Sequence, residues 1–205
     1  MGATLVELRI GDEPAAWGRA GFAVAGDVVR VGSVQLRLVG ESEGRGILSW
    51  ALDGVTDAEV DGLPAHDAPA AGDAHGANPN GVRALDHVVV TSPDLDRTID
   101  ALVATGLELR RVRDLGTRQQ AFFWLGEPIL ELVGPKEPSG TGPSRFWGVA
   151  CTVDDIDATA ASLGDACGDP KDAVQPGRRI ATLRHEPLGM SVPVAFMTPH
   201  VRSGR

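Results

Sequence analysis

Two residues of this sequence have side chains that can bind a metal or transfer a proton, and both lie on strand-like segments. His87 stands near the head of the apolar run "LDHVVVT" (85–91), and Glu131 lies within the run "PILELVG" (128–134). An imidazole and a carboxylate that face a common space can bind a divalent cation or act together in proton transfer. They can also form a hydrogen-bonded pair that only stabilises a sheet.

Strand alternation predicts that these two side chains meet. Successive side chains of a β-strand point to opposite faces, which fixes the face of every second residue. If Gly126 and Glu127 form a two-residue hairpin turn, Phe122 lies opposite Glu131 on the neighbouring strand. One predicted face then carries His87, Glu131, Gln120, Phe122 and Trp124.

The elements that position these residues follow a strand, a helix and then three strands. The strand at 85–91 is followed by a helix that Ser92 is expected to cap and that Gly106 is expected to end. The remaining strands of this unit are predicted at 107–116, 118–125 and 128–134.

The same order recurs elsewhere in the chain. A second copy is predicted, with a strand, a helix and two strands at 146–152, 155–163, 179–185 and 191–197. The N-terminal residues form a compressed copy, with a strand at 4–10, a short helix, a hairpin through Gly32-Ser33 and an unpaired strand at 47–53. Residues 56–82, rich in Ala, Gly, Pro and Asp, are interpreted as a linker.

This arrangement resembles the vicinal oxygen chelate superfamily, which includes glyoxalase I, bleomycin-resistance proteins and extradiol dioxygenases. The likeness rests on the order of the elements, on "LDHVVVTSPDLDR" at the head of the module and on "LELVG" at its end. It implies an α+β fold in which repeated βαβββ modules form a cup-shaped mixed sheet with helices on the convex face. The expected parts are a partial module (1–55), a linker (56–82), a paired-module domain (83–199) and a tail (200–205).

The resemblance also implies where a metal would bind. In metal enzymes of that superfamily, each module supplies a ligand from its first strand and another from its last. His87 and Glu131 match these positions, whereas Gly148 and Ala195 stand at the matching positions of the second copy and offer no donor. Because zinc normally takes three protein ligands, we expect no resident cofactor. A divalent metal on His87 and Glu131, completed by another residue or subunit, is the alternative.

The second copy is expected to form the other wall of the cup. Its cup-facing residues are predicted to be small or apolar, and we assign to ligand contact Gly148, Ala150, Ala195 and Met197. Trp147 alternates with Gly148 and is therefore expected to point into the core. Together with Gln120, Phe122 and Trp124 on the first wall, these residues suit a partly apolar organic ligand.

Three other polar side chains share one predicted face of the N-terminal hairpin: Arg30, Gln35 and Arg37. They are interpreted as a solvated or interface surface, with binding of an anionic group as the alternative. In the linker, His66 and His75 have acidic neighbours, and a solvated segment is favoured over a metal site.

Composition excludes several classes of protein. The 205 residues carry a formal net charge of -9 without a large basic cluster, so nucleic acid is not an expected partner. No run of about 18 apolar residues predicts a membrane span, and the first residues lack the features of a signal peptide. Two cysteines, Cys151 and Cys167, fit a reduced, cytoplasmic protein.

Three functions remain open at this point. The first is binding or sequestration of a small organic molecule without chemistry, as in bleomycin resistance. The second is a lyase or isomerase in which His87 is the base and Glu131 orients it. The third is a non-catalytic interaction module whose cup is filled by its own side chains. A homodimer is left open, because the family builds its cups both within one chain and across two.

Overall fold

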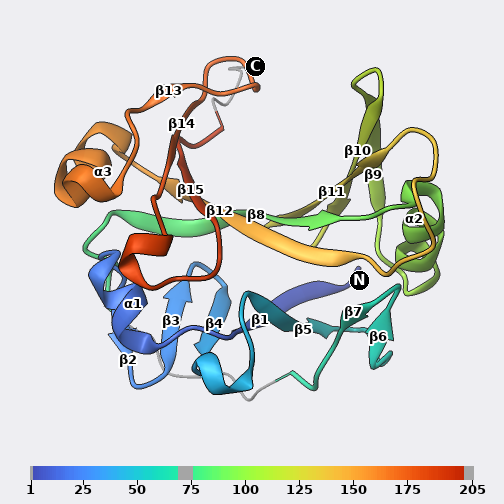
Figure 1. Ribbon diagram of the computed structural model, residues 1–205, viewed down its shortest axis with the longest axis horizontal. Coiled ribbons are helices and arrows are strands. Elements are labelled where there is room, and N and C mark those ends of the chain that lie inside the picture. The colour runs from blue at the N-terminus through green and yellow to red at the C-terminus, as the bar shows by residue number, and fades with distance from the viewer. Residues whose placement is uncertain (1, 69–75, 201–205) are drawn as a thin grey trace.

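The structure is a computed structural model that describes residues 2–68 and 76–200. It contains two stacked sheets with helices at their ends (Figure 1). The smaller sheet has the order β2-β3-β4-β1-β5 and is formed by β1 (Thr4–Ile10), β2 (Val24–Ala25), β3 (Val28–Val31), β4 (Val34–Leu38) and β5 (Ile47–Asp53).

The larger sheet has eight strands and carries the predicted site. These strands are β8 (Val82–Thr91), β9 (Leu109–Asp114), β10 (Arg118–Trp124), β11 (Ile129–Pro135), β12 (Arg145–Val153), β13 (Lys171–Asp172), β14 (Arg179–Thr182) and β15 (Val194–Met197). Their order is β13-β14-β15-β12-β8-β11-β10-β9. The helices are α1 (Pro14–Arg19), α2 (Leu95–Ala104) and α3 (Ile156–Leu163), with short 3-10 turns at Glu41–Glu43, Gly164–Ala166 and Glu186–Leu188.

The predicted repeat is confirmed in the strand pairing. In each of the three modules the first strand runs parallel to the last: β1 with β4, β8 with β11, and β12 with β15. Strands β8 and β12 pair antiparallel and join two modules into one sheet. The strand at 47–53 is not unpaired, because β5 pairs antiparallel with β1 as β12 does with β8. The N-terminal copy is thus one short complete module plus the first strand of another.

The core lies between the two sheets. Leu8 and Trp50 from the small sheet and Val88 and Leu130 from the large sheet are fully buried. Burying one such side chain stabilises a fold by roughly 1.5–3 kcal/mol. At one edge of this interface the Trp50 and Phe146 rings meet edge to face, with centroids 5.2 Å apart. The small sheet therefore covers the middle of the convex face, and α2 and α3 cover its two ends (Figure 1).

The helix after β8 follows the prediction with one correction. Asp94, not Ser92, is the cap: its carboxylate accepts from the backbone N–H of Arg97, while the Ser92 hydroxyl accepts from the N–H of Asp94. Both Ser and Asp can satisfy a free N–H at a helix start, so the local sequence allows either. Gly106 follows the helix with a φ of +87°, as its predicted role requires.

The described parts of residues 56–82 make ordered contacts with both sheets. They include a two-stranded ribbon, β6 (Glu59–Val60) with β7 (Leu63–Pro64). In its turn, Asp61 accepts hydrogen bonds from Arg97, Thr98 and Ser144. Burial alone would raise the pKa of Asp61, but these hydrogen bonds together lower it. His75 and residues 201–205 lie outside the described residues.

Two remaining predictions concern the cysteines and the membrane. Cys151 and Cys167 are free and buried, and burial raises the pKa of the Cys151 thiol to about 12. Such a thiol is a packing group and not a nucleophile. Within the described residues, none of the helices has the length and apolar character to cross a bilayer.

Candidate functional site

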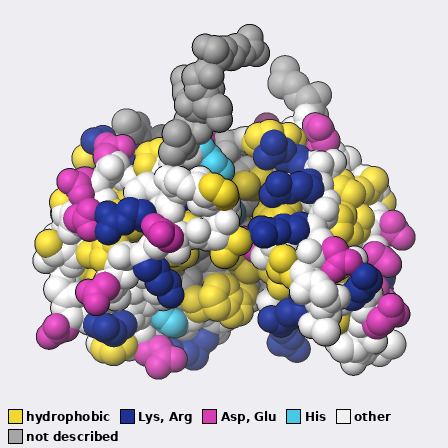
Figure 2. All heavy atoms as spheres, turned by 90° about the horizontal axis from the view of Figure 1, so that it is seen from above, with side chains coloured by type: hydrophobic (Ala, Val, Ile, Leu, Met, Phe, Trp, Pro, Cys, Tyr) yellow, Lys and Arg dark blue, Asp and Glu magenta, His cyan; other side chains and the backbone are white. Residues whose placement is uncertain are grey.

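The large sheet curves into a cup whose hollow opens away from the small sheet. Figure 2 looks into this opening, and Figure 1 shows the β9–β10 arm and the β13–β14 arm rising on either side. Two adjoining lobes of ≈ 460 Å³ and ≈ 630 Å³ share three lining residues, His87, Glu131 and Ile180. The predicted pair therefore lies at the centre of a space large enough for a small organic molecule.

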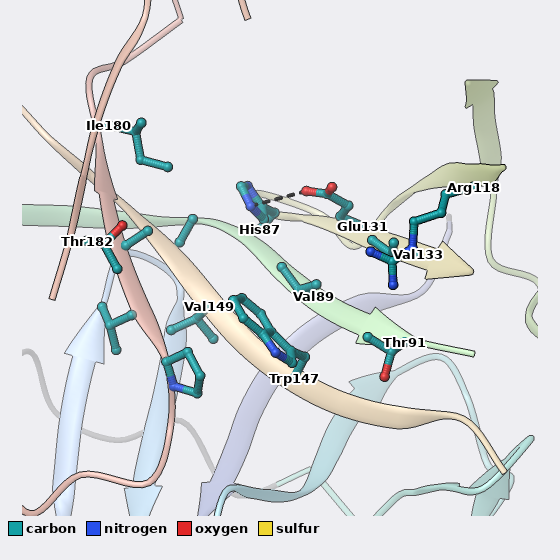
Figure 3. A pocket seen from close by; sticks show the side chains of 14 residues that line it. His87, Val89, Thr91, Arg118, Glu131, Val133, Trp147, Val149, Ile180 and Thr182 are labelled. Carbon is teal, nitrogen blue, oxygen red and sulfur yellow. Dashed lines mark ion pairs between the residues drawn. The ribbon is translucent and has the colours of Figure 1, made fainter. Parts of the chain in front are cut away.

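His87 and Glu131 point toward one another across the floor of the cup (Figure 3). The imidazole Nε2 lies 3.3 Å from Glu131 Oε2, slightly beyond the usual hydrogen-bond range of about 2.7–3.2 Å. Their side chains are 11% and 16% exposed, so both reach the hollow while remaining mostly enclosed. The other carboxylate oxygen of Glu131 accepts a 2.6 Å hydrogen bond from Gln120 Nε2, which holds the carboxylate in place. The predicted β10–β11 register, with Phe122 opposite Glu131, is confirmed.

The sequence did not predict the closest partner of His87. Asp86 Oδ2 lies 2.8 Å from His87 Nδ1, although neighbouring residues of a regular strand point to opposite faces. The register explains this: His87 pairs with Ala150 and Leu85 pairs with Cys151, which leaves Asp86 as an extra residue. Such a β-bulge re-aims a side chain, and here it brings Asp86 beside the histidine.

Asp86 is held in turn by a buried arginine. Arg178 Nη2 donates to Asp86 Oδ1 at 2.5 Å, Arg178 Nη1 donates to Oδ2 at 3.2 Å, and the arginine side chain is only 1% exposed. Thr152 Oγ1 donates to the same carboxylate, at 3.2 Å. Arg178 Nε donates to the Thr198 carbonyl, so the C-terminal segment closes this end of the cup.

These contacts decide which nitrogen of His87 carries a hydrogen. Burial alone would raise the pKa of Asp86, but hydrogen bonds from His87 and Arg178 and the arginine charge hold it well below its usual range. Asp86 is therefore a carboxylate and can only accept. Nδ1 of His87 must donate to it, which leaves Nε2 as the ring atom that faces Glu131 and the hollow.

Trp147 is the second residue that a bulge re-aims. Phe146 pairs with Val90 and Gly148 with Val89, so Trp147 has no partner on β8. The prediction that it packs in the core is wrong: its side chain is 56% exposed and lines the hollow (Figure 3). The extra residue breaks the alternation from which that prediction was drawn.

The structure brings most of the other predicted residues around the same hollow. Gln120, Phe122 and Met197 line the larger lobe, and Ala150 and Ala195 line the smaller one. Their positions agree with the predicted faces of β10, β12 and β15.

Two predicted contact residues lie elsewhere. Trp124, 40% exposed, lines an adjoining depression with Asp86 and Arg110. Gly148 is buried and is not among the lining residues, because Pro193 lies against it. A Cβ at position 148 would stand 2.6 Å from the Pro193 carbonyl oxygen.

The donor set does not fit the metal site of the superfamily. His87 Nε2 and Glu131 Oε2 converge, but Ala195 has no donor and position 148 has no room for a histidine. Within the described residues, no three His, Cys, Asp or Glu side chains are grouped so that they could hold a metal ion. Two protein ligands fall short of the three that catalytic zinc normally takes, so we derive no chemistry through a metal.

The class of protein that this fold and site define is supported by comparison with known families. The model of the Glyoxalase/Bleomycin resistance protein/Dioxygenase superfamily matches residues 84–183. These residues run from the start of the first cup module into the second and include His87, Asp86 and Glu131. Through that segment the chain resembles this superfamily. A search of the curated proteins found no significant match.

Solved structures agree on the fold across the whole chain. A mutant of 4-hydroxymandelate synthase from Streptomyces coelicolor is 16% identical, with a TM-score of 0.65, and the match covers 100% of this chain and 95% of that one. An extradiol ring-cleaving dioxygenase from B.fuscum is 13% identical, with a TM-score of 0.60, covering 100% and 73%. At these identities the likeness concerns the fold alone.

Proposed function

We propose that the cup of the large sheet binds a small, partly apolar organic molecule. The open hollow is the observation that carries this proposal: a lobe of ≈ 460 Å³ has His87 and Glu131 at its floor and apolar side chains such as Val149 and Ile180 on its walls. Ligand sites are typically about 300–1,000 Å³, mostly apolar, with a few converging polar groups. An interaction module with a self-filled cup would leave no such space.

A neutral apolar dye, N-phenyl-1-naphthylamine, provides a direct test. Its fluorescence should rise on binding to the wild-type protein, and Ala195→Phe should weaken that binding at least about tenfold by filling the smaller lobe. Ala161→Phe, on the exposed side of α3, is the matched control and should bind the dye like the wild type. Equal binding by Ala195→Phe and the wild type would refute the cup as the binding site.

Proton transfer, as in an isomerase or lyase, is a second candidate that one observation favours. The Asp86–His87 hydrogen bond orients the imidazole so that Nε2, the atom beside Glu131, faces the hollow. A base in this position would take a proton from a ligand carbon next to a carbonyl group, and Glu131 or the imidazole would return it to a neighbouring atom. Asp86 would stabilise the imidazolium that forms in between.

Exchange of carbon-bound hydrogen for deuterium separates catalysis from binding alone. In D₂O, the wild type should speed loss of the C3 proton signals of 2-oxobutyrate, and His87→Gln should return the rate to that of buffer. His66→Gln, a histidine outside the cup, should keep the wild-type rate. Exchange at the buffer rate with the wild type would leave binding as the function of the cup.

A further inference from the structure

One wall of the cup is built from arginines. Arg111 and Arg113 on β9 pair with Phe122 and Gln120 of β10, so they share the cup-facing side of the sheet. Both line the larger lobe, and Arg118 lines the smaller one. Figure 2 shows basic side chains in a column beside the hollow.

A third bulge adds another guanidinium to this wall. Phe122 pairs with Arg111 and Phe123 pairs with Leu109, which leaves Arg110 as an extra residue of β9. Its guanidinium carbon lies 3.7 Å from the centroid of the Trp124 ring, and that of Arg111 lies 4.9 Å from the Phe122 ring. Stacking on aromatic faces restrains the guanidinium groups and leaves their N–H edges free to donate.

These arginines differ from the other arginines around the cup. Arg178 and Arg179 form ion pairs with Asp86 and Asp157. No described residue forms an ion pair or a hydrogen bond with the side chain of Arg111, Arg113 or Arg118. In a chain with a net charge of -9, a row of unpaired guanidinium groups beside a hollow is a site of concentrated positive potential.

Two carboxylates line the same space and add negative charge to it. Glu131 is already bonded by Gln120 and lies beside His87, and Asp172 follows Lys171 on the opposite arm. Neither reaches the arginines as an ion-pair partner. The positive wall is therefore available to a ligand.

The wall opposite the arginines is apolar. Ile180 and Met197 line the larger lobe from β14 and β15, and Val174, 75% exposed, lines it from the segment between β13 and β14. A ligand that satisfies both walls has an anionic group at one end and an apolar body at the other. Guanidinium groups bind carboxylates and phosphates with paired N–H donors, so the arginine wall can bind the anionic end.

We propose that the molecule bound in the cup is an organic anion, whose carboxylate or phosphate is held by Arg111 and Arg113 while its apolar part lies against Ile180 and Met197. This inference rests on the proposed binding function of the cup and specifies its ligand class. His87 and Glu131 then lie beside the middle of the bound molecule, because they line both lobes.

A pair of dyes that differ by one anionic group tests this inference. 1-Anilinonaphthalene-8-sulfonate is N-phenyl-1-naphthylamine with one added sulfonate. The wild type should bind the sulfonate dye at least about tenfold more tightly than the neutral dye, because the sulfonate oxygens accept charge-assisted hydrogen bonds from the guanidinium groups. Arg111→Gln/Arg113→Gln should abolish this preference and keep the affinity for the neutral dye. Arg45→Gln, at a surface ion pair outside the cup, should retain the preference.

Competition then distinguishes the anionic groups. Phenylacetate or phenyl phosphate should displace the sulfonate dye, and the stronger competitor identifies the favoured anion, whereas neutral phenylacetamide should not displace it. Equal affinity for the two dyes, unchanged in the double variant, would overturn the anion inference and leave the binding function intact. If Ala195→Phe affects neither dye, both proposals fail.

Discussion

The two sheets of this protein carry comparable polar groups on matching strands. Among the described residues, those of the large sheet face a hollow, whereas those of the small sheet bind one another. In the N-terminal module, Glu7 on the first strand is 2% exposed and accepts from Gln35 Nε2 at 2.9 Å and Arg37 Nε at 3.0 Å. Its second oxygen lies 3.2 Å from His66 Nε2, and Ser49 Oγ lies 2.8 Å from Nδ1 of the same ring. The carboxylate is therefore fully engaged within the protein.

This closed cluster corrects the two N-terminal interpretations. Gln35 and Arg37 are not a solvated surface or a free anion site, because they bind Glu7. His66 is not a solvated linker residue, since its imidazole is 20% exposed and contacts Glu7 of the small sheet.

The polar groups of the cup, unlike those around Glu7, are not all bound to one another. Glu131 and His87 keep an atom toward the hollow, and the arginines of β9 and β10 have no acidic partner among the described residues. A polar cluster that satisfies itself contributes to stability, whereas one that leaves donors and acceptors facing open space is suited to a ligand. Repetition of one module has thus produced one structural site and one candidate binding site.

The largest effect is expected from removing the arginine that supports the cup. Arg178→Met would leave Asp86 buried without its ion-pair partner and should lower the free energy of unfolding by about 3–5 kcal/mol. Arg37→Met, on the small sheet, should cost less because the Arg37 side chain is 31% exposed, whereas that of Arg178 is 1% exposed. Urea denaturation measures both, and a larger loss for Arg37→Met would reverse the comparison.

A methyl group at position 148 tests why the second module has no metal-binding side chain at that position. Gly148→Ala would place Cβ 2.6 Å from the Pro193 carbonyl oxygen and should destabilise the protein by about 1–3 kcal/mol. Gly140→Ala, where no heavy atom lies within 4 Å of the added Cβ, is the control and should leave stability unchanged. If the two variants unfold at the same urea concentration, space does not restrict position 148.

Acid should weaken the polar network of the cup. The pKa of Asp86 is lower in the folded protein than in the unfolded chain, so its contribution to stability is complete above the unfolded pKa of about 3.9. That contribution is lost as the pH falls from there toward the folded pKa. The free energy of unfolding, measured by urea denaturation from pH 6 to pH 3, should fall in the wild type below about pH 4. In Asp86→Asn this fall should be shallower, and equal slopes would contradict the assignment.

The smallest effect is expected from metal removal. Because the cup supplies two protein donors, dialysis against EDTA should leave the thermal unfolding midpoint and the affinity for N-phenyl-1-naphthylamine unchanged. Elemental analysis of the undialysed protein should find less than about 0.1 equivalents of zinc, manganese, nickel or iron, as two ligands hold such ions weakly. One tightly held equivalent would show that another group completes the site.

The sequence predicted the order of the strands and the pairing of His87 with Glu131 in one hollow. Both follow from short-range rules, since alternation assigns faces and a two-residue turn at Gly126 sets the hairpin register. The three bulges at Asp86, Arg110 and Trp147 were not predicted. Each depends on pairing with another strand, which for Asp86 and Trp147 is about 60 residues away, so alternation along a single strand does not reveal it.

Arg178 was missed for a related reason. It lies in a short turn before β14, and only the assembled cup brings it to Asp86, 92 residues away. The acidic residue directly before the strand histidine was the available signal. An Asp-His pair at the start of a strand would have placed Asp86 beside His87 if a bulge had been allowed for.

The central claim is that His87, and not its N-terminal counterpart, presents a nitrogen to a ligand in the cup. Long-range ¹H–¹⁵N NMR of the histidine rings, with and without 1-anilinonaphthalene-8-sulfonate, tests it most directly. We predict a hydrogen on Nδ1 of His87 and a dye-dependent shift of its Nε2, with the His66 ring unchanged. The claim is contradicted if the neutral His87 ring carries its hydrogen on Nε2. It is also contradicted if the dye shifts the ring signals of His66 and leaves those of His87 unchanged.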